Sequence, residues 1–267
     1  MPWFDPEDRS KPVINPLEQI AGKYPGMEIP VLPSRAVVFC LGKGLPVLRE
    51  HYPCHTIMEK LPGFITHSEV LGIEGISGIC FLHGGYASPQ AACTIETLHV
   101  LGIEEVFLVG LCGGFDGRLS VGDVILPEKI LSEEGTSLHY LESSGFAETA
   151  PSVPLGEISA FFQRKGYRVF REATVTTDAV YRQTYHKESV WREKGCAAVD
   201  MEASAVVNIC NLYGIRNTVA LMVSDRHPLS EGDPAWQWGG TGFADRCTRF
   251  ILDCITFNTQ EPGSRQI

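Results

Sequence analysis

The stretch that decides the fold runs from Cys196 to His227, with the sequence C-A-A-V-D-M-E-A-S-A-V-V-N-I-C-N-L-Y-G-I-R-N-T-V-A-L-M-V-S-D-R-H. The apolar run of residues 197–199 predicts a short buried strand. Apolar residues then recur at helical spacing and predict a helix closed by Gly214, because glycine is common just after a helix end. These apolar residues are Ala203, Val206, Val207 and Cys210. Residues 217–223 predict a second strand, so the stretch is expected to form strand, helix and strand.

Two acidic residues lie where these strands are expected to end. Glu202 follows the first strand and Asp225 follows the second. In open α/β sheets, ligands bind in the crevice outside the carboxyl ends of the strands. We therefore expect the two carboxylates to converge there. One would hold a sugar through its hydroxyls, and the other would give a proton to a leaving group.

Length and composition exclude several classes of protein. The 267 residues suit one large α/β domain or two small ones, and 44% hydrophobic residues suffice for a sizeable core. A net charge of −10 disfavours a nucleic-acid-binding surface, which would be basic. The sequence has neither an apolar stretch long enough to span a membrane nor a secretory signal pattern, so we expect a cytoplasmic protein. The nine scattered cysteines predict buried free thiols, and no metal site is expected.

The rest of the chain is expected to form one domain with two appendages. Residues 1–34 contain seven prolines and predict an extended arm, packed on the domain or on a partner subunit. Residues 35–257 are the expected domain, and residues 258–267 a frayed tail. Three continuous apolar runs in the domain are typical of strands buried on both faces; they are residues 35–41, 79–82 and 105–109.

A helix is expected between the second and third of these strands. Ser88 before Pro89 predicts its N-cap and first residue, and Gly102 ends it. Strand, helix and strand at this spacing predict a βαβ unit with parallel strands. Farther along, we expect a strand near residues 121–127, loops over 132–155, a helix over 158–165, a strand over 167–175 and a last amphipathic helix over 243–257.

Glycine-rich turns are expected after the first and third strands. They are Gly42-Lys43-Gly44 and Gly110-Leu111-Cys112-Gly113-Gly114. Glycines at such positions let the backbone approach a ligand closely, although a plain tight turn accounts for them equally well.

The order and spacing of four pieces resemble the nucleoside phosphorylase family, which includes the bacterial purine nucleoside and uridine phosphorylases and is similar to the methylthioadenosine nucleosidases. The pieces are the Gly42 loop, Ser88-Pro89 opening a helix, Val109-Gly110-x-Cys112-Gly113, and Val199-Asp200-Met201-Glu202 followed by Val223-Ser224-Asp225. The resemblance implies a single α/β domain with a twisted, partly barrel-like mixed sheet flanked by helices. It also implies a homo-oligomer, either a dimer or a trimer of dimers, because members often borrow active-site residues from a neighbour.

The resemblance also implies roles for individual residues. Glu202 matches the glutamate that accepts hydrogen bonds from the ribose 2′ and 3′ hydroxyls. Asp225 matches the acid that protonates or hydrogen-bonds N7 of a purine leaving group. Met201 would pack against the ribose, and the base would be lined by Cys112, Gly113, Thr177 and Val180. The acceptor or phosphate pocket would be lined by Gly42, Gly110, Leu111 and Ser88. No cofactor is implied, with phosphate as a possible co-substrate.

The sequence departs from this family where phosphate should bind. Phosphorylases hold phosphate with arginines, because a buried dianion needs paired charge. Here Pro46 and Leu108 stand at two arginine positions, and Leu111 replaces a hydroxyl residue. The arginine lent by a neighbour falls near residues 65–67, which contain none. The possible substitutes are Lys43, Arg49 and His83.

Other positions separate the possible substrates and reactions. Glu50 only approximates the water-activating glutamate of nucleosidases. The uracil-binding Gln-x-Arg aligns with residues 184–186, Thr-Tyr-His, while Ser224-Asp225 is kept, which favours a purine over uracil. Trp236 and Trp238 form a lid over the base, a surface hairpin or an oligomer contact.

These observations predict an enzyme of purine salvage that cleaves the N-ribosyl bond of a small-molecule nucleoside, preferably a purine one, by phosphorolysis as in the family. The alternative is a hydrolytic nucleosidase, because the phosphate-binding arginines are absent. A further alternative is a non-catalytic homologue that binds nucleosides.

Overall fold

The computed structural model describes residues 7–8, 10–23, 25–26, 28, 31–63, 67–141 and 145–260. Its helices are α1 (Pro16–Lys23), α2 (Gly44–His51), α3 (Ala87–Val100), α4 (Leu155–Arg164), α5 (Tyr185–Glu193), α6 (Ala203–Leu212) and α7 (Phe243–Thr259), with 3₁₀ turns η1 (Thr136–His139) and η2 (Val180–Arg182). Its strands are β1 (Arg35–Phe39), β2 (Cys54–Met58), β3 (Val70–Ile73), β4 (Ile79–His83), β5 (Glu105–Gly114), β6 (Val124–Ile125), β7 (Lys129–Ser132), β8 (Phe146–Glu148), β9 (Val169–Phe170), β10 (Ala173–Thr176), β11 (Cys196–Asp200), β12 (Arg216–Arg226) and β13 (Gln237–Trp238).

The described strands form one mixed sheet, in which the long strand β5 pairs with three other strands. Its main path runs β2-β3-β4-β1-β5-β11-β10-β7-β8, and β12 joins it at β5. β5 pairs in parallel with β1 at its start and with β12 along its whole length, and it pairs antiparallel with β11 at its end. The expected α/β fold with a mixed, helix-flanked sheet is confirmed.

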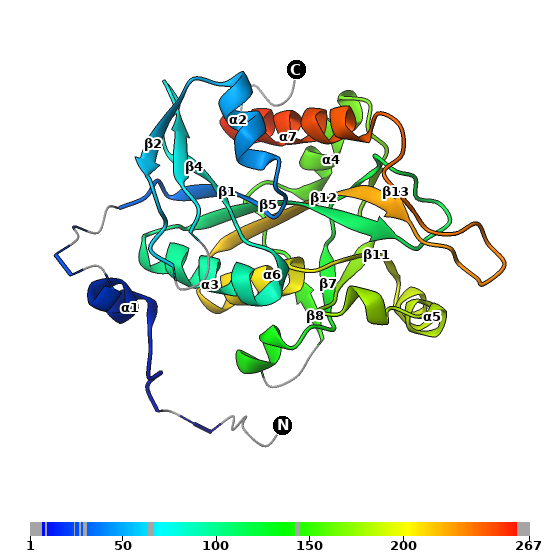
Figure 1. The fold of residues 1–267 in the computed structure, drawn as a ribbon, viewed down its shortest axis with the longest axis horizontal. Helices are drawn as coiled ribbons and strands as arrows, with labels where there is room; N and C mark the ends of the chain where they lie inside the picture. Colours follow the sequence, from blue (N-terminus) through cyan, green and yellow to red (C-terminus); the bar gives the residue numbers. More distant parts are fainter. Residues whose placement is uncertain are drawn as a thin grey trace.

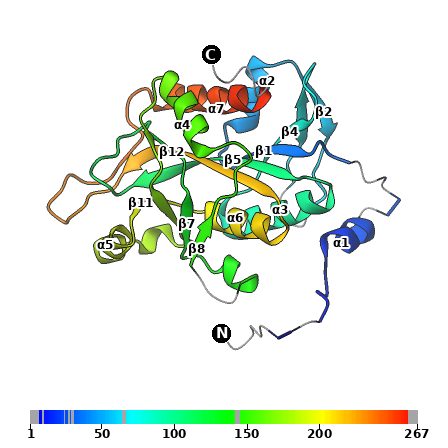
Figure 2. The ribbon, with the colours of Figure 1, turned by 180° about the vertical axis from the view of Figure 1, so that it is seen from behind.

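Helices cover both faces of this sheet. In Figures 1 and 2, α2, α4 and α7 lie over one face, and α3 and α6 lie over the other. Each face has its own apolar core. Phe162 of α4 and Phe250 of α7 are in the first core, and Ile95 of α3 and Val206 of α6 are in the second. The helices on the two faces support the sheet, and the site lies at the ends of its strands.

The expected βαβ unit is present, with one strand inserted. β4 and β5 both run parallel to β1, which lies between them. Helix α3 makes the connection, but it begins at Ala87 after an N-cap at Tyr86, so the prediction of Ser88 as N-cap is wrong. The buried Ser88 Oγ instead donates to the Met201 carbonyl at 2.9 Å. Ser88 therefore ties α3 to the turn that carries Glu202.

The prediction of a second glycine-rich turn is also wrong, because residues 110–114 continue strand β5. β12 pairs with β5 as far as Gly114, with a bulge at Ser224 between Val223 and Asp225, so the glycines stay in the ladder. The expected strand over residues 167–175 is divided into β9 and β10, because β9 pairs with β6 while β10 pairs with β7 and β11. The segment expected as loops over 132–155 contains β8, which pairs with β7.

The ends of the chain differ from their predictions as well. The arm expected to be extended contains α1, because Asn15 Oδ1 caps the helix by accepting from Glu18 N at 3.0 Å and Pro16 takes its first position. Helix α7 continues through Thr259, and residues 261–267 of the predicted tail lie outside the described residues. Among the described helices, none is both long and apolar enough to cross a membrane.

Candidate active site

A cavity of about 900 Å³ opens at the carboxyl ends of β5, β11 and β12. The three strands meet here because β5 pairs with β11 and β12 at its end. The cavity contains both acids that the sequence places at strand ends, Glu202 and Asp225. This is the expected position for a ligand site in an open α/β sheet.

The structure brings most of the predicted site residues together. Besides the two acids, the predicted residues that line the cavity are Met201, Cys112, Gly113, Val180 and Leu111. Four predicted residues do not line it: Thr177, Gly42, Gly110 and Ser88. The buried Thr177 hydroxyl donates to Glu133, and Gly110 lies in the β5 ladder against Leu221. At Gly42 a side chain would meet the Tyr86 hydroxyl at 2.8 Å, so Tyr86 covers the first glycine loop.

Glu202 is fixed by the backbone around it. Asp200 Oδ1 accepts from the backbone N–H groups of Glu202 and Ala203 at 2.9 and 2.7 Å, which holds the turn between β11 and α6. Glu202 Oε1 accepts from Ala87 N at 2.6 Å. Burial and the nearby Asp200 charge raise the pKa of Glu202 to about 8. The carboxyl therefore favours its protonated form at neutral pH, and hydroxyl donors from a sugar would favour the charged form.

Asp225 accepts three hydrogen bonds. Its Oδ2 accepts from Trp236 Nε1 at 2.6 Å and faces His227 Nε2 at 3.1 Å, and its Oδ1 accepts from Ser224 Oγ at 2.6 Å. Burial raises the pKa of Asp225, but the bonds from His227, Ser224 and Trp236 outweigh burial and hold it below its usual value. Asp225 is therefore a carboxylate at neutral pH.

His227 and Glu188 are residues of the site that the sequence analysis does not predict. Both line the cavity, and His227 Nδ1 lies 2.6 Å from Glu188 Oε1 on α5. Burial lowers the pKa of His227, but Asp225 and Glu188 raise it to about 9. The sequence signal for His227 is its position two residues after Asp225, since residues i and i+2 of an extended chain share a face. Glu188 comes from a different element, so no local pattern indicates it.

Among the described residues that line the cavity, His227 is the one basic side chain. None of the described residues that line it is a lysine or an arginine, and five are acids. The acids are Glu188, Asp200, Glu202, Asp225 and Glu231. Arg49, one candidate for holding phosphate, pairs with Glu69 on the surface. Leu108 is buried in the core and Pro46 is exposed on α2, while residues 64–66 lie outside the described residues.

Aromatic side chains form the rim of the cavity. Trp236 and Trp238 both line it; Trp238 is in β13, which pairs antiparallel with β12, and Trp236 precedes that strand. Tyr86, Tyr181 and Tyr185 also line the cavity and are exposed. Both tryptophans therefore belong to the wall of the cavity, and Trp236 also donates to Asp225.

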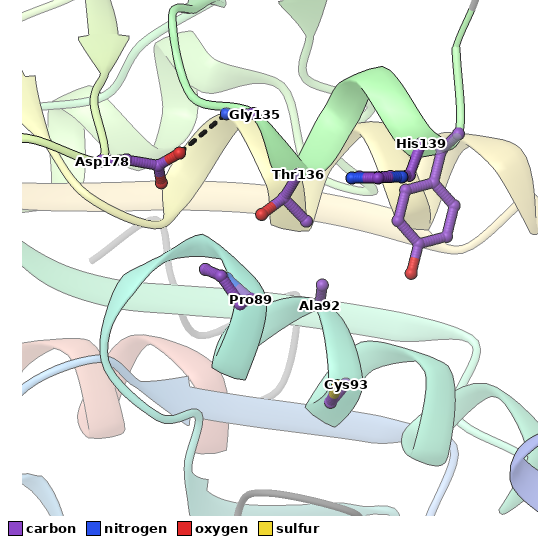
Figure 3. Close-up of a pocket in the computed structure, with 8 residues that line it drawn as sticks. Pro89, Ala92, Cys93, Gly135, Thr136, His139 and Asp178 are labelled. Carbon is purple, nitrogen blue, oxygen red and sulfur yellow. Dashed lines mark hydrogen bonds between the residues drawn. The ribbon is translucent and has the colours of Figure 1, made fainter. Parts of the chain in front are cut away.

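A second cavity of about 450 Å³ lies between α3 and η1 (Figure 3). Pro89, Ala92 and Cys93 face Thr136 and His139 across it, and Asp178 Oδ2 accepts from Gly135 N at 2.8 Å. Among the described residues that line this cavity, Asp178 is the single acid. The larger cavity is therefore the candidate active site. Among the described residues, no group of three or more His, Cys, Asp or Glu side chains is arranged to hold a metal ion.

Comparison with known proteins agrees with this fold. A purine nucleoside phosphorylase of the DeoD type from Clostridium beijerinckii is 25% identical over 191 residues, which cover 69% of this chain and 79% of that protein. An uncharacterized protein of Acanthamoeba polyphaga mimivirus is 29% identical over 153 residues, 57% of this chain. The matched part spans only 58% of the viral protein's own length.

Among solved structures, an AMP nucleosidase from Bacteroides thetaiotaomicron superposes with a TM-score of 0.67 and 21% identity, covering 91% of this chain and 97% of that one. At this identity the likeness concerns the fold. The family model described as the phosphorylase superfamily matches residues 35–256, which is most of the chain. The protein is therefore a member of the phosphorylase superfamily.

Proposed function

We propose that this protein cleaves the N-ribosyl bond of a purine nucleoside by hydrolysis, with water as the acceptor. The observation that carries the proposal is the cavity itself, in which Glu202 and Asp225 meet among five acids without a lysine or arginine in the described lining. Phosphorolysis, the first expectation from the sequence, would require the same cavity to hold a phosphate dianion. Burying that dianion beside several carboxylates is unfavourable unless cations pair with it.

The two principal acids suit the two ends of the bond. Glu202 would accept hydrogen bonds from the ribose hydroxyls, and such bonds to a carboxylate are stronger than those between neutral groups. Asp225 would lie against the base, where it passes a proton to the leaving nitrogen. Proton transfer of this kind contributes about 10²–10⁴-fold to the rate.

The acidic cavity also suits the charge that develops on the sugar. Breaking an N-ribosyl bond leaves an oxocarbenium-like ring, with positive charge shared between C1′ and the ring oxygen. Fixed negative groups around such a centre stabilise it most in the transition state. A cation stabilised in this way reacts with water without a strong base. The reaction therefore does not need Glu50 to activate the water, and Glu50 is exposed on α2, away from the cavity.

Product analysis with and without phosphate tests the proposal. The protein would be incubated with adenosine, inosine, guanosine, methylthioadenosine and uridine, and the bases and sugars would be separated. Free purine and free ribose at the same rate in both buffers are the expected result. Ribose 1-phosphate formed only in phosphate buffer would contradict the choice of water.

Phosphorolysis is the second candidate, and the similarity to a DeoD-type purine nucleoside phosphorylase favours it. It requires lysine or arginine side chains to pair with phosphate, and the described lining has none, so a neighbouring subunit would have to lend them. Binding of a nucleoside in calorimetry without any turnover across the panel would contradict both reactions and leave the non-catalytic alternative.

A further inference from the structure

The residue assigned to protonate the base has no proton of its own. Both oxygens of Asp225 accept hydrogen bonds, from Ser224 on one side and from Trp236 and His227 on the other. These bonds stabilise the charged form of the carboxylate. A general acid must start protonated. The proton that reaches the leaving group must therefore come from a group next to Asp225.

His227 is placed to hold that proton. Its ring lies between two carboxylates, with Nε2 at 3.1 Å from Asp225 Oδ2 and Nδ1 at 2.6 Å from Glu188 Oε1. Its side chain is only 13% exposed, so water competes little for these bonds. Each carboxylate favours the imidazolium form, which donates from both nitrogens.

Arg192 is a further charged group near His227. Arg192, on the same helix as Glu188, lies 4.0 Å from Glu188 Oε2 and donates to the Phe115 carbonyl. The Phe115 ring packs 6.5 Å from the His227 ring. Arg192 weakens the influence of Glu188 without pairing with it closely, so the negative charge of Glu188 still acts on His227. Burial lowers the pKa of His227, and the two carboxylates together raise it to about 9.

We propose that Glu188 and His227 form a relay that supplies Asp225 with the proton given to the leaving base. The proposal rests on the proposed function, because it describes how the same N-ribosyl bond is broken. The bond between C1′ and the base nitrogen breaks, and its electron pair stays with the base. The base takes a proton from Asp225, and Asp225 takes the Nε2 proton of His227. His227 is then neutral, and its Nδ1 proton stays on the ring, hydrogen-bonded to Glu188.

The remaining atoms balance through water. A water oxygen forms the new bond to C1′ and loses one proton to solvent, and solvent returns one proton to His227 after the base has left. Glu188 and His227 are therefore positioning residues that act through Asp225. Glu188 sets the proton affinity of His227, and His227 stores the proton.

A pH profile of Glu188→Gln tests this arrangement. In the wild type, kcat is expected to fall as pH rises through about 9, where His227 loses its proton. Glutamine keeps the size of the side chain but removes its charge, so the alkaline limb should move to lower pH by about one unit or more. At pH 6 the variant should keep kcat within a few fold. Glu193→Gln, exposed on the same helix, is the matched control and should leave the limb in place.

An unchanged alkaline limb in Glu188→Gln would overturn the relay, even if the nucleoside is still cleaved. His227→Gln gives a second measure. It should lower kcat by about 10²-fold with little change in KM and abolish the limb, because the relay contributes only to proton transfer. A loss confined to KM would contradict the relay, since His227 would then serve binding alone.

Histidine nitrogen NMR of the full chain separates this inference from the proposed function. The His227 signal, assigned by its loss in His227→Gln, should titrate near pH 9 in the wild type and lower in Glu188→Gln. Titration near the usual value in both proteins would overturn the relay whatever the enzyme's activity. Titration near 9 with no cleavage of any nucleoside would instead contradict the proposed function, and the relay with it.

Discussion

At Gly113 the missing side chain allows two functional groups to meet. A Cβ atom at this position would lie 2.3 Å from His227 Nε2 and 3.1 Å from Asp225 Oδ2. The distance to His227 is far inside van der Waals contact, and the distance to Asp225 is tighter than an ordinary contact. Glycine is therefore needed here for close approach, and not for an unusual backbone angle.

Gly113→Ala should accordingly lower the catalytic efficiency more than the stability of the fold. The methyl group would push the His227 ring away from Asp225, and we expect kcat/KM to fall by about 10²-fold because a misplaced catalytic group has costs of this size. The measurement is steady-state kinetics together with thermal unfolding. Gly117→Ala is the control, since its Cβ would make an ordinary contact with Leu229 at 3.5 Å. Equal kinetics for the two variants would contradict the prediction.

At Glu202, function and stability are expected to oppose each other. Its raised pKa means that the folded state holds this proton more tightly than the unfolded state does. The stabilisation is complete below the usual value of 4.5 and is lost as pH rises through about 8. Glu202→Gln stays neutral, so it should become more stable than the wild type between pH 6 and pH 9, by about 1 kcal/mol or more. Glu202→Gln should also lose most activity, because a neutral amide accepts hydrogen bonds from the ribose hydroxyls less strongly than a carboxylate does.

Urea unfolding at both pH values measures this difference. Glu157→Gln, exposed at the start of α4, should show the same pH dependence as the wild type. The interpretation fails if Glu202→Gln parallels the wild type between pH 6 and pH 9.

At the level of elements, helix α3 and the turn after β11 act as one unit. Ser88 donates to the Met201 carbonyl, and Ala87 N donates to Glu202. Ala87 has a positive φ of 61°, which costs free energy in a residue with a side chain. The start of α3 is therefore shaped to meet Glu202, and the packing of α3 on α6 maintains it.

Ser88→Ala should weaken this unit. Removing a buried hydroxyl leaves its partner carbonyl unsatisfied, which costs about 1–3 kcal/mol. We also expect a several-fold rise in KM, because the backbone beside Glu202 becomes less fixed. Denaturant unfolding and kinetics measure the two effects. Ser77→Ala, at an exposed turn, should change neither quantity, and a Ser88→Ala protein with wild-type stability would contradict the prediction.

The elements near Glu202 and Asp225 follow from local patterns, and the exceptions have physical causes. Strand β11, helix α6 and strand β12 are predicted because apolar spacing and Gly214 mark them. Residues 110–114 are misjudged because pairing with β12, a long-range contact, outweighs the preference of glycine for turns. The hydroxyl of Ser88 likewise has a distant partner in place of its own helix end.

At the scale of the whole molecule, the sequence locates the sugar and base side of the cavity better than its acceptor side. Glu202 and Asp225 are indicated by their places at strand ends. Glu188 is brought to His227 by the packing of α5, which no pattern in the sequence specifies. The acidity of the cavity is likewise a sum over five residues from separate segments, visible only once the chain is folded.

Assembly is the remaining property of the whole molecule, and we expect a homo-oligomer, a dimer or a trimer of dimers. In the described part of the N-terminal segment, helix α1 contacts α3, whereas the Val13 and Val31 side chains are 96% and 86% exposed. Apolar side chains in such positions are typical of surfaces that another subunit covers.

Light scattering of the wild type, and of a Val13→Asp, Val31→Asp double variant, tests this assembly. The wild type should have a mass of at least twice 29.3 kDa, and the variant should dissociate more readily, because burying the new carboxylates in an interface is unfavourable. Thr259→Asp, at the opposite end of the chain on α7, is the control for added charge and should keep the wild-type mass. A wild type of 29.3 kDa at every concentration would contradict the expected oligomer. It would also exclude a phosphate site completed by a neighbouring subunit. The acidic cavity of a single chain would then have to bind the acceptor without help from another subunit.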